Sequence, residues 1–176
     1  RPVGDDKALD RAWEGIKSAK RPVILAGNGC IRRRASKQLR QFCDTTGIGV
    51  ISTFMAKGCV DMDADYCLYT IGLQAKDYTY LAIEAADVII TLGFDMVEYN
   101  PRLWNPNGDK TIVHADFLHA EIDENYHPEY EIVGDLAHTL WMLNERVTEG
   151  GALAWDRSYQ AKARSEMSAE VSEYKE

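Results

Sequence analysis

The chain has 176 residues, of which 45 % are hydrophobic and 27 % charged, and its formal net charge at pH 7 is −8. These values are typical of one globular domain with a charged surface. The negative charge argues against a nucleic-acid partner, because phosphates bind a basic face. No apolar stretch approaches the ~20 residues that cross a bilayer, and no signal peptide is visible. We therefore expect a cytoplasmic protein without a membrane partner. Its first residue, Arg rather than Met, predicts a fragment or a processed product.

The cysteine and aspartate residues give no complete metal-binding pattern. The cysteines form no C-x-x-C pair and lie at no zinc spacing from a histidine. The alternating aspartates at 61–65 resemble the start of a calcium loop, but Tyr66 and Gly72 replace the Gly and Glu that such a loop needs. We therefore predict no metal site, and reduced, mostly buried thiols at Cys30, Cys43, Cys59 and Cys67.

The first half of the chain alternates between helical spacing and short continuous apolar runs. Asp5 or Asp6 can cap the first helix, and Pro22 opens the first run at a position where a strand tolerates proline. In chain order we predict a helix at 5–19, a strand at 22–26, a helix at 33–46, a strand at 48–52 and a long surface segment at 53–73.

The second half continues the same alternation. Residues 94–110 are rich in Pro, Asn and Gly, which predicts a loop. The helical spacing at 74–86 places Tyr78, Leu81, Ala82 and Ala85 on one side. In chain order we predict a helix at 74–86, a strand at 87–92, a loop at 94–110, a strand at 111–115, an irregular segment at 118–128, a strand at 131–133 and a helix starting at Gly134-Asp135.

This order of elements predicts an α/β fold. Alternating strands and helices form a doubly wound, Rossmann-like parallel sheet, here of about six strands, with helices on both faces. Residues 1–149 would form this domain. Residues 150–176 are polar, and we interpret them as a helical linker or tail toward a further domain.

Small or polar residues follow the strands at the edge where parallel sheets bind ligands. Gly27-Asn28-Gly29 resembles a dinucleotide-binding turn, whose glycines let backbone amides approach a phosphate, but Arg32 replaces the third glycine. The alternative is a tight turn that only glycine allows. The arginines at 32–34 either reach a phosphate, form a solvated first helical turn or face a partner surface.

Two aspartates extend this candidate site. Asp116 ends a strand, and its carboxylate either accepts hydrogen bonds from a ribose or an adenine or caps the following turn. Asp135 is a good helix cap with or without a ligand. His114 lies within a strand and is expected to be a hydrogen-bonded core residue. No set of reacting groups appears, so we predict no catalytic residue. The full list of candidate ligand contacts is Gly27, Asn28, Gly29, Ser52, Thr53, Gly93, Asp116 and Asp135.

Five stretches also carry a family likeness, and they follow one another in the family's order between about residues 5 and 145. They are K-R-P-V-I-L-A-G-N-G at 20–29, T-G-I-G-V-I-S-T at 46–53, A-A-D-V-I-I-T-L-G at 85–93, I-V-H-A-D at 112–116 and I-V-G-D at 132–135. Together they resemble the central domain of thiamine diphosphate-dependent enzymes. The segments at 97–105 and 124–135 look most like catabolic-type acetolactate synthases.

The resemblance implies a division of labour within a longer parent. The first domain of this parent would supply the glutamate that activates thiamine diphosphate. The third domain would supply a G-D-G…N motif that binds magnesium and the diphosphate. The present sequence contains no G-D-G. The central domain packs the subunit, lines part of the substrate approach and in some members binds FAD or another ADP-containing ligand. Flavin-binding members usually have an Arg after the strand that ends here at Gly93. The present Gly93-Phe94-Asp95 places a carboxylate beside a diphosphate, which disfavours FAD but leaves it among the candidate ligands.

Three hypotheses follow. The first is the central domain of an acetolactate-synthase-like enzyme that decarboxylates pyruvate and joins the product to a 2-oxo acid. In this enzyme the domain would act as a scaffold within a homo-oligomer, either a dimer or a tetramer. The alternative parent enzyme is a related 2-oxo acid decarboxylase. The second is a separate binding module for FAD, NAD or ADP. The third is a deoxyhypusine-synthase-like or sirtuin-like NAD enzyme, which needs a catalytic Lys or His in the cleft.

Overall fold

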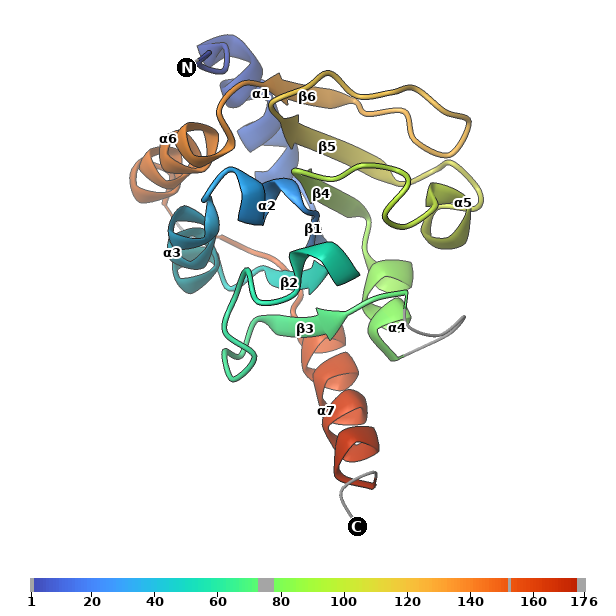
Figure 1. Ribbon diagram of the computed structural model, residues 1–176. Helices are drawn as coiled ribbons and strands as arrows, with labels where there is room; N and C mark the ends of the chain where they lie inside the picture. Colours follow the sequence, from blue (N-terminus) through green and yellow to red (C-terminus); the bar gives the residue numbers. More distant parts are fainter. Residues whose placement is uncertain (1, 73–77, 152, 174–176) are drawn as a thin grey trace.

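The centre of the computed structural model, which describes residues 2–72, 78–151 and 153–173, is a six-stranded sheet (Figure 1). All pairings between its strands are parallel, and the strand order is β3-β2-β1-β4-β5-β6. The predicted doubly wound α/β fold is therefore confirmed. The strands are β1 Pro22–Ala26, β2 Gly49–Ser52, β3 Cys67–Thr70, β4 Val88–Leu92, β5 Thr111–Asp116 and β6 Tyr130–Val133.

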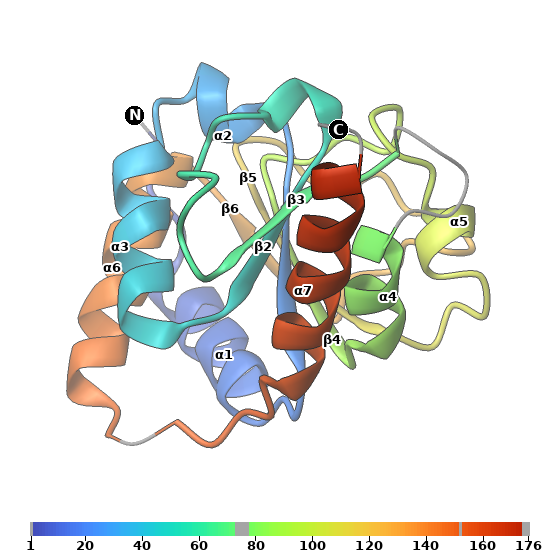
Figure 2. The ribbon, with the colours of Figure 1, turned by 90° about the horizontal axis from the view of Figure 1, so that it is seen from below.

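The middle of the sheet is buried on both faces. Every residue of β1, β2 and β4 is buried, as their continuous apolar runs predict. Helices α1 Asp6–Lys17, α3 Ser36–Thr46 and α6 Leu136–Glu149 cover one face, and α4 Tyr78–Ala85 and α7 Ser158–Glu173 cover the other (Figure 2). In the strand order β3-β2-β1-β4-β5-β6, the direction of chain progression reverses between β1 and β4. An open α/β sheet forms a crevice at this position.

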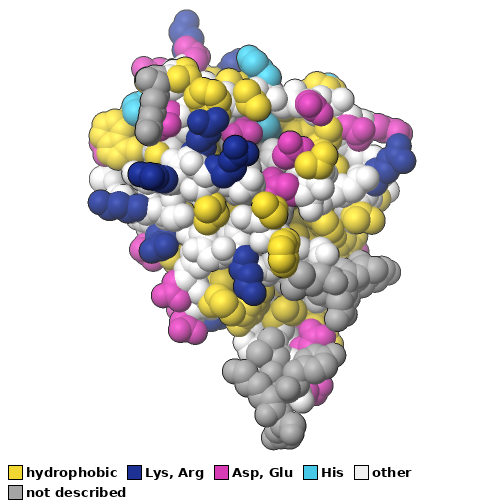
Figure 3. Space-filling view, viewed as in Figure 1, with side chains coloured by type: hydrophobic (Ala, Val, Ile, Leu, Met, Phe, Trp, Pro, Cys, Tyr) yellow, Lys and Arg dark blue, Asp and Glu magenta, His cyan; other side chains and the backbone are white. Residues whose placement is uncertain are grey.

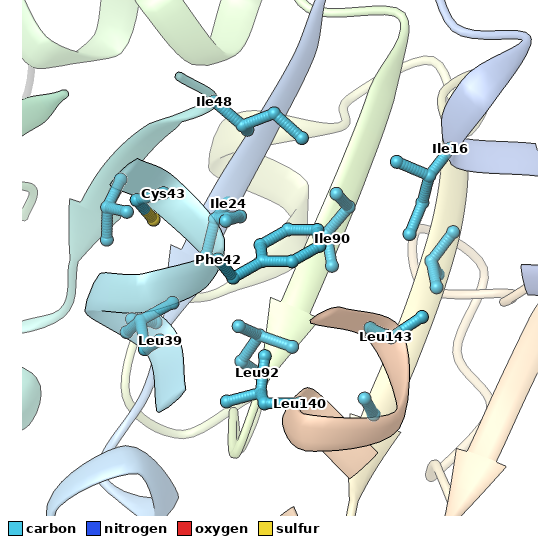
Figure 4. Close-up of a cluster of buried hydrophobic side chains, with 14 of the residues drawn as sticks. Ile16, Ile24, Leu39, Phe42, Cys43, Ile48, Ile90, Leu92, Leu140 and Leu143 are labelled. Carbon is cyan, nitrogen blue, oxygen red and sulfur yellow. The ribbon is translucent and has the colours of Figure 1, made fainter. Parts of the chain in front are cut away.

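Apolar stripes of the predicted helices fill the core. Figure 4 shows the Phe42 ring pointing from α3 toward Ile24 and Ile90 of the sheet, with Leu140 and Leu143 of α6 nearby. Burying a side chain of this size stabilises a fold by roughly 1.5–3 kcal/mol. The α1 stripe of Leu9, Ala12, Trp13 and Ile16 and the α6 stripe of Leu136, Leu140, Leu143 and Val147 are buried as predicted.

Three local predictions differ from the structure. The helix predicted at 33–46 begins only at Ser36, because Arg34 has a positive φ of 54° and separates α3 from the short helix α2, Gly29–Arg32. The segment predicted as surface at 53–73 contains the 3₁₀ turn η1, Phe54–Ala56, and the edge strand β3. The predicted loop at 94–110 contains a one-turn helix, α5 Pro101–Trp104.

The buried face of α4 also differs. The helix buries Thr79, Ala82 and Ile83, whereas Tyr78 and Leu81 are exposed. Apolar residues occur on every side of this short helix, so the spacing alone did not identify the inner face. Residues 74–77 of the predicted helix lie outside the described residues.

Helix α7, in the polar segment after residue 150, packs on the domain. Ala163 is buried in the cluster on the α4 face, and the Tyr159 hydroxyl donates to the Pro22 carbonyl at the start of β1. Arg164 donates from Nη1 to the Cys67 carbonyl of β3 at 2.7 Å. The helix therefore covers the β3 side of the sheet; its role as a linker to a further domain stays a prediction.

At the amino edge of the sheet, one carboxylate links two strand starts. Asp87, just before β4, accepts hydrogen bonds from the backbone N–H groups of Lys20 at 2.8 Å and Arg21 at 2.7 Å. These residues precede β1, the neighbour of β4. The side chain therefore fixes the alignment of the two central strands before their ladder begins.

Candidate functional site

A cleft of about 510 Å³ opens at the carboxyl edge, where β1, β4 and β5 end. Its walls come from α2, η1 and the loops after β4 and β5. Figure 3 shows hydrophobic side chains and side chains of both charges on the face that carries α2. Four of the predicted contact residues line the cleft: Asn28, Gly29, Gly93 and Asp116.

The glycines of the cleft are explained by contacts between backbones. The Gly29 N–H donates to the Gly93 carbonyl at 2.8 Å, and the Gly27 N–H donates to the Leu92 carbonyl at 2.9 Å. A Cβ on Gly27 would lie 2.4 Å from the Gly93 carbonyl oxygen, and one on Gly29 would lie 2.5 Å from the Gly93 Cα. The turn therefore needs glycine because two loops touch, which matches the alternative interpretation of this motif.

Glu98, which the sequence analysis did not single out, is the most connected side chain of the cleft. Its Oε1 accepts hydrogen bonds from the Asn28 N–H and from the Thr53 hydroxyl, each at 2.8 Å. Its Oε2 accepts from the Asp95 N–H at 2.9 Å. A carboxylate of this chain therefore occupies the place beside the Gly27-Asn28-Gly29 turn where a phosphate oxygen would have to lie.

The structure does not bring Ser52 and Thr53 to the cleft wall. The Ser52 hydroxyl lies 3.1 Å from the Thr70 hydroxyl on β3, and Thr53 is buried with its hydroxyl on Glu98. Both side chains therefore join neighbouring elements to one another. Their predicted role as ligand contacts has no support in this geometry.

The two aspartates act first as caps. Asp116 Oδ1 accepts from the Phe117 N–H at 2.7 Å, and burial raises the pKa of this carboxyl while that bond lowers it. Asp135 accepts from the His138 N–H at 3.1 Å and caps α6. Asp116 still faces the cleft, whereas Asp135 lines a separate hollow of about 270 Å³.

The charges around the cleft are mixed. Arg32 and Arg33 line it on the α2 side, and the Arg33 guanidinium stacks 4.2 Å above the centre of the Phe117 ring. Asp95, Glu98 and Asp116 line it on the other sides. The positive side could attract an anionic group, but the carboxylates oppose a diphosphate that reaches the glycine turn.

His114 is held in a closed hydrogen-bond chain. Its Nε2 donates to the Leu118 carbonyl, which can only accept, at 3.0 Å, and its Nδ1 lies 2.7 Å from the Tyr126 hydroxyl. The Tyr126 oxygen in turn lies 2.6 Å from the Thr91 hydroxyl. His114 is thus the hydrogen-bonded core residue that the sequence predicts, and its ring nitrogens are already engaged.

The cleft offers little for catalysis. Among the described residues that line it there is no Lys and no His, which the NAD-enzyme hypothesis requires. Within the described ranges, no group of three or more His, Cys, Asp or Glu residues is arranged to hold a metal ion. Glu98, the natural acid–base candidate of the cleft, accepts hydrogen bonds at both carboxylate oxygens from groups within the fold.

Comparison with known proteins identifies the family of this chain. Residues 9–143 match the family described as "Thiamine pyrophosphate enzyme, central domain". The chain belongs to this family. The central domain defined by that match contains the sheet, helices α3, α4 and α5, and all eight predicted contact residues.

Several relatives of this chain are named as acetolactate synthases. The chain is 38 % identical over 140 residues to the "Acetolactate synthase" of Bacillus subtilis, covering 79 % of this chain and 24 % of the relative. It is 32 % identical over 144 residues to the "Acetolactate synthase, catabolic" of Raoultella terrigena, covering 81 % and 25 %. A chloroplastic relative from Arabidopsis thaliana is 30 % identical over 145 residues, covering 80 % and 21 %. The chain thus aligns with about a quarter of each relative's length.

Among the described helices, none combines the length and the apolar character that crossing a membrane requires.

Proposed function

We propose that this chain is the central domain of a thiamine diphosphate-dependent enzyme of the acetolactate synthase type. The complete protein would decarboxylate pyruvate and join the two-carbon product to a second 2-oxo acid, in the cytoplasm, with magnesium and thiamine diphosphate bound by other domains. The central domain would hold those domains and the subunits of a dimer or tetramer in place. The family match over residues 9–143 carries this proposal.

The geometry supports a scaffold role for this chain. The candidate groups at the carboxyl edge, Glu98 and Asp116, are engaged as acceptors of backbone hydrogen bonds. Apolar side chains that line the cleft are nevertheless exposed, among them Val97 at 88 %, Leu118 at 66 % and Met55 at 55 %. Neighbouring domains of a longer protein would cover such side chains and gain hydrophobic stabilisation.

Thiamine diphosphate and magnesium do not fit the described residues of this chain, because these residues offer no metal-binding cluster. FAD does not fit the Gly27-Asn28-Gly29 turn either, since the Asn28 N–H is already bonded to a carboxylate and the Gly29 N–H to a carbonyl. No step of the reaction is therefore assigned to residues of this chain.

Activity measurements test the proposal directly. The 176-residue chain, supplied with pyruvate, thiamine diphosphate and magnesium, should release no carbon dioxide above the uncatalysed rate, whereas the complete protein should form acetolactate. Turnover by the 176-residue chain alone would disprove the scaffold role. Absence of acetolactate formation by the complete protein, with turnover of another 2-oxo acid, would favour the decarboxylase alternative.

A second candidate function, binding of FAD, NAD or ADP, is favoured by one observation. Arg32 and Arg33 line a cleft large enough for part of a nucleotide, and both residues are exposed. Calorimetric titration of the chain with each of the three compounds separates the candidates. Heat of binding from any of them at millimolar concentration or below would support the binding module. Absence of heat with all three compounds would exclude this function.

A further inference from the structure

Three loops at the carboxyl edge direct hydrogen-bond donors to one place. The Asn28 N–H follows β1, the Thr53 hydroxyl follows β2, and the Asp95 N–H follows β4. All three donate to the Glu98 carboxylate, two to Oε1 at 2.8 Å and one to Oε2 at 2.9 Å. Charge-assisted bonds of this kind are about twice as strong as bonds between neutral groups.

We propose that these donors form an oxyanion-binding position and that Glu98 is its built-in anion. The position would accept a small oxyanion, a carboxylate or a phosphate, if the glutamate side chain were absent. In the native chain Glu98 keeps external phosphates from the glycine turn and ties the ends of β1, β2 and β4 together. The proposal does not depend on the reaction of the complete protein.

The surroundings fit an anion at this position. A Cβ on Gly27 would lie 2.8 Å from Glu98 Oε2, so the carboxylate lies directly beside the glycine turn. Thr53 is 1 % exposed, so loss of Glu98 would leave its hydroxyl buried without that acceptor. A buried donor without an acceptor is costly, which favours any oxyanion that can enter.

An entry path is present as well. Glu98 lines the open cleft of about 510 Å³, so a small anion from solution would reach the donors without unfolding the domain. Arg32 and Arg33, which line the same cleft, would attract it, although Asp95 and Asp116 oppose them. These opposing charges predict weak binding, in the millimolar range, and direct the experiment to concentrations of about 100 mM.

Replacement of the side chain and chemical rescue test the proposal. The Glu98→Ala variant of the 176-residue chain is compared with the unmodified chain by thermal unfolding at neutral pH, in formate, phosphate or chloride at equal ionic strength. We expect a lower Tm for Glu98→Ala in chloride and a recovery of about 3 °C or more in formate. Recovery in formate alone identifies a carboxylate-shaped position, and recovery in both formate and phosphate a general oxyanion position.

The matched control is Glu121→Ala, which removes the same side chain and charge from an exposed position on another loop. Formate and phosphate should change the Tm of this control and of the unmodified chain by less than about 1 °C relative to chloride. An equal response of Glu98→Ala and Glu121→Ala to the oxyanions would overturn the proposal, because general salt effects would then explain it.

A second variant decides the case if Glu98→Ala does not fold. Glu98→Gln keeps the shape of the side chain but places an amide NH₂ where one oxygen accepted a hydrogen bond. We expect the amide of Asn28 or of Asp95 to exchange its hydrogen about tenfold faster or more in this variant. Unchanged exchange at both amides would show that the carboxylate is not held by these donors.

Discussion

The backbones of Gly29 and Gly93 lie in direct contact across the carboxyl edge, joined by a hydrogen bond of 2.8 Å from the Gly29 N–H to the Gly93 carbonyl. Each glycine excludes a side chain on the other: a Cβ on Gly93 would lie 2.6 Å from the Gly29 Cα. Gly93 also has a φ of +57°, a conformation that costs other residues free energy. The contact joins the loop after β1 to the loop after β4.

We predict that Gly93→Ala lowers the free energy of unfolding by about 3 kcal/mol or more, because strain from the positive φ adds to a clash between backbones. Gly58→Ala is the matched control. Gly58 has a φ of +90° but no atom within 4 Å of an added Cβ, so this variant should lose only about 1 kcal/mol. Urea unfolding measures both changes, and equal losses would contradict the role of the contact.

Tyr126→Phe should destabilise the chain by about 1–3 kcal/mol, because it removes the hydroxyl that bonds both His114 and Thr91 in the interior. Tyr130→Phe provides the comparison, since the Tyr130 hydroxyl forms no hydrogen bond within the described part of the chain. Its effect should stay within about 0.5 kcal/mol. A similar loss in both variants, measured by urea unfolding, would show that the two hydrogen bonds of the Tyr126 hydroxyl add no specific stabilisation.

The buried thiols predict a loss of stability in alkaline solution. Burial raises the pKa of Cys59 from 9.0 to about 11, so the folded chain keeps this proton to a higher pH than the unfolded chain does. The resulting stabilisation is fully present below pH 9 and disappears as the pH rises toward 11. Cys59→Ser should reduce this pH dependence in unfolding experiments at a series of pH values. A slope unchanged by the substitution would assign the effect to other groups.

Thiol labelling checks the same buried state independently. All four cysteines are buried and free, so a thiol reagent at neutral pH should label none of them within minutes in the folded chain and all four in urea. Rapid labelling of any cysteine without urea would show that part of the core opens readily.

Val97 tests the proposed scaffold role. Because this side chain is 88 % exposed, Val97→Asp should change the stability of the 176-residue chain by no more than about 0.5 kcal/mol. The same substitution in the complete protein should weaken assembly, since it would bury a charge against a neighbouring domain. Light scattering of both proteins measures the outcome. Normal assembly of the substituted complete protein would exclude Val97 from an interface.

The sequence predicted the central strands correctly because β1, β4 and β5 are continuous apolar runs bounded by turn residues. The edge strand β3 was missed, since it has only four residues and Tyr69 interrupts it with a φ of 65°. Edge strands are half exposed and carry no continuous apolar signal.

The candidate site was predictable only in part. The glycines and Asp116 mark strand ends, so their position at one edge followed from the parallel topology. Glu98 had no such signal, because it stands in a loop and two of its three donors, on Asn28 and Thr53, come from distant parts of the chain. A single acidic residue between Val97 and Tyr99 becomes meaningful only when the fold brings the three loops together.

The position of Asp87 and Glu98 on either side of β4 has a consequence for synthesis. The acceptors for the Lys20, Arg21 and Asn28 amides, Asp87 and Glu98, lie far along the chain from these donors. A nascent polypeptide that ends before Asp87 therefore contains β1 and β2 but none of these acceptors. It also lacks β4, the strand that pairs with the open side of β1. We expect the first half to remain unfolded on the ribosome until β4 and its following loop have emerged.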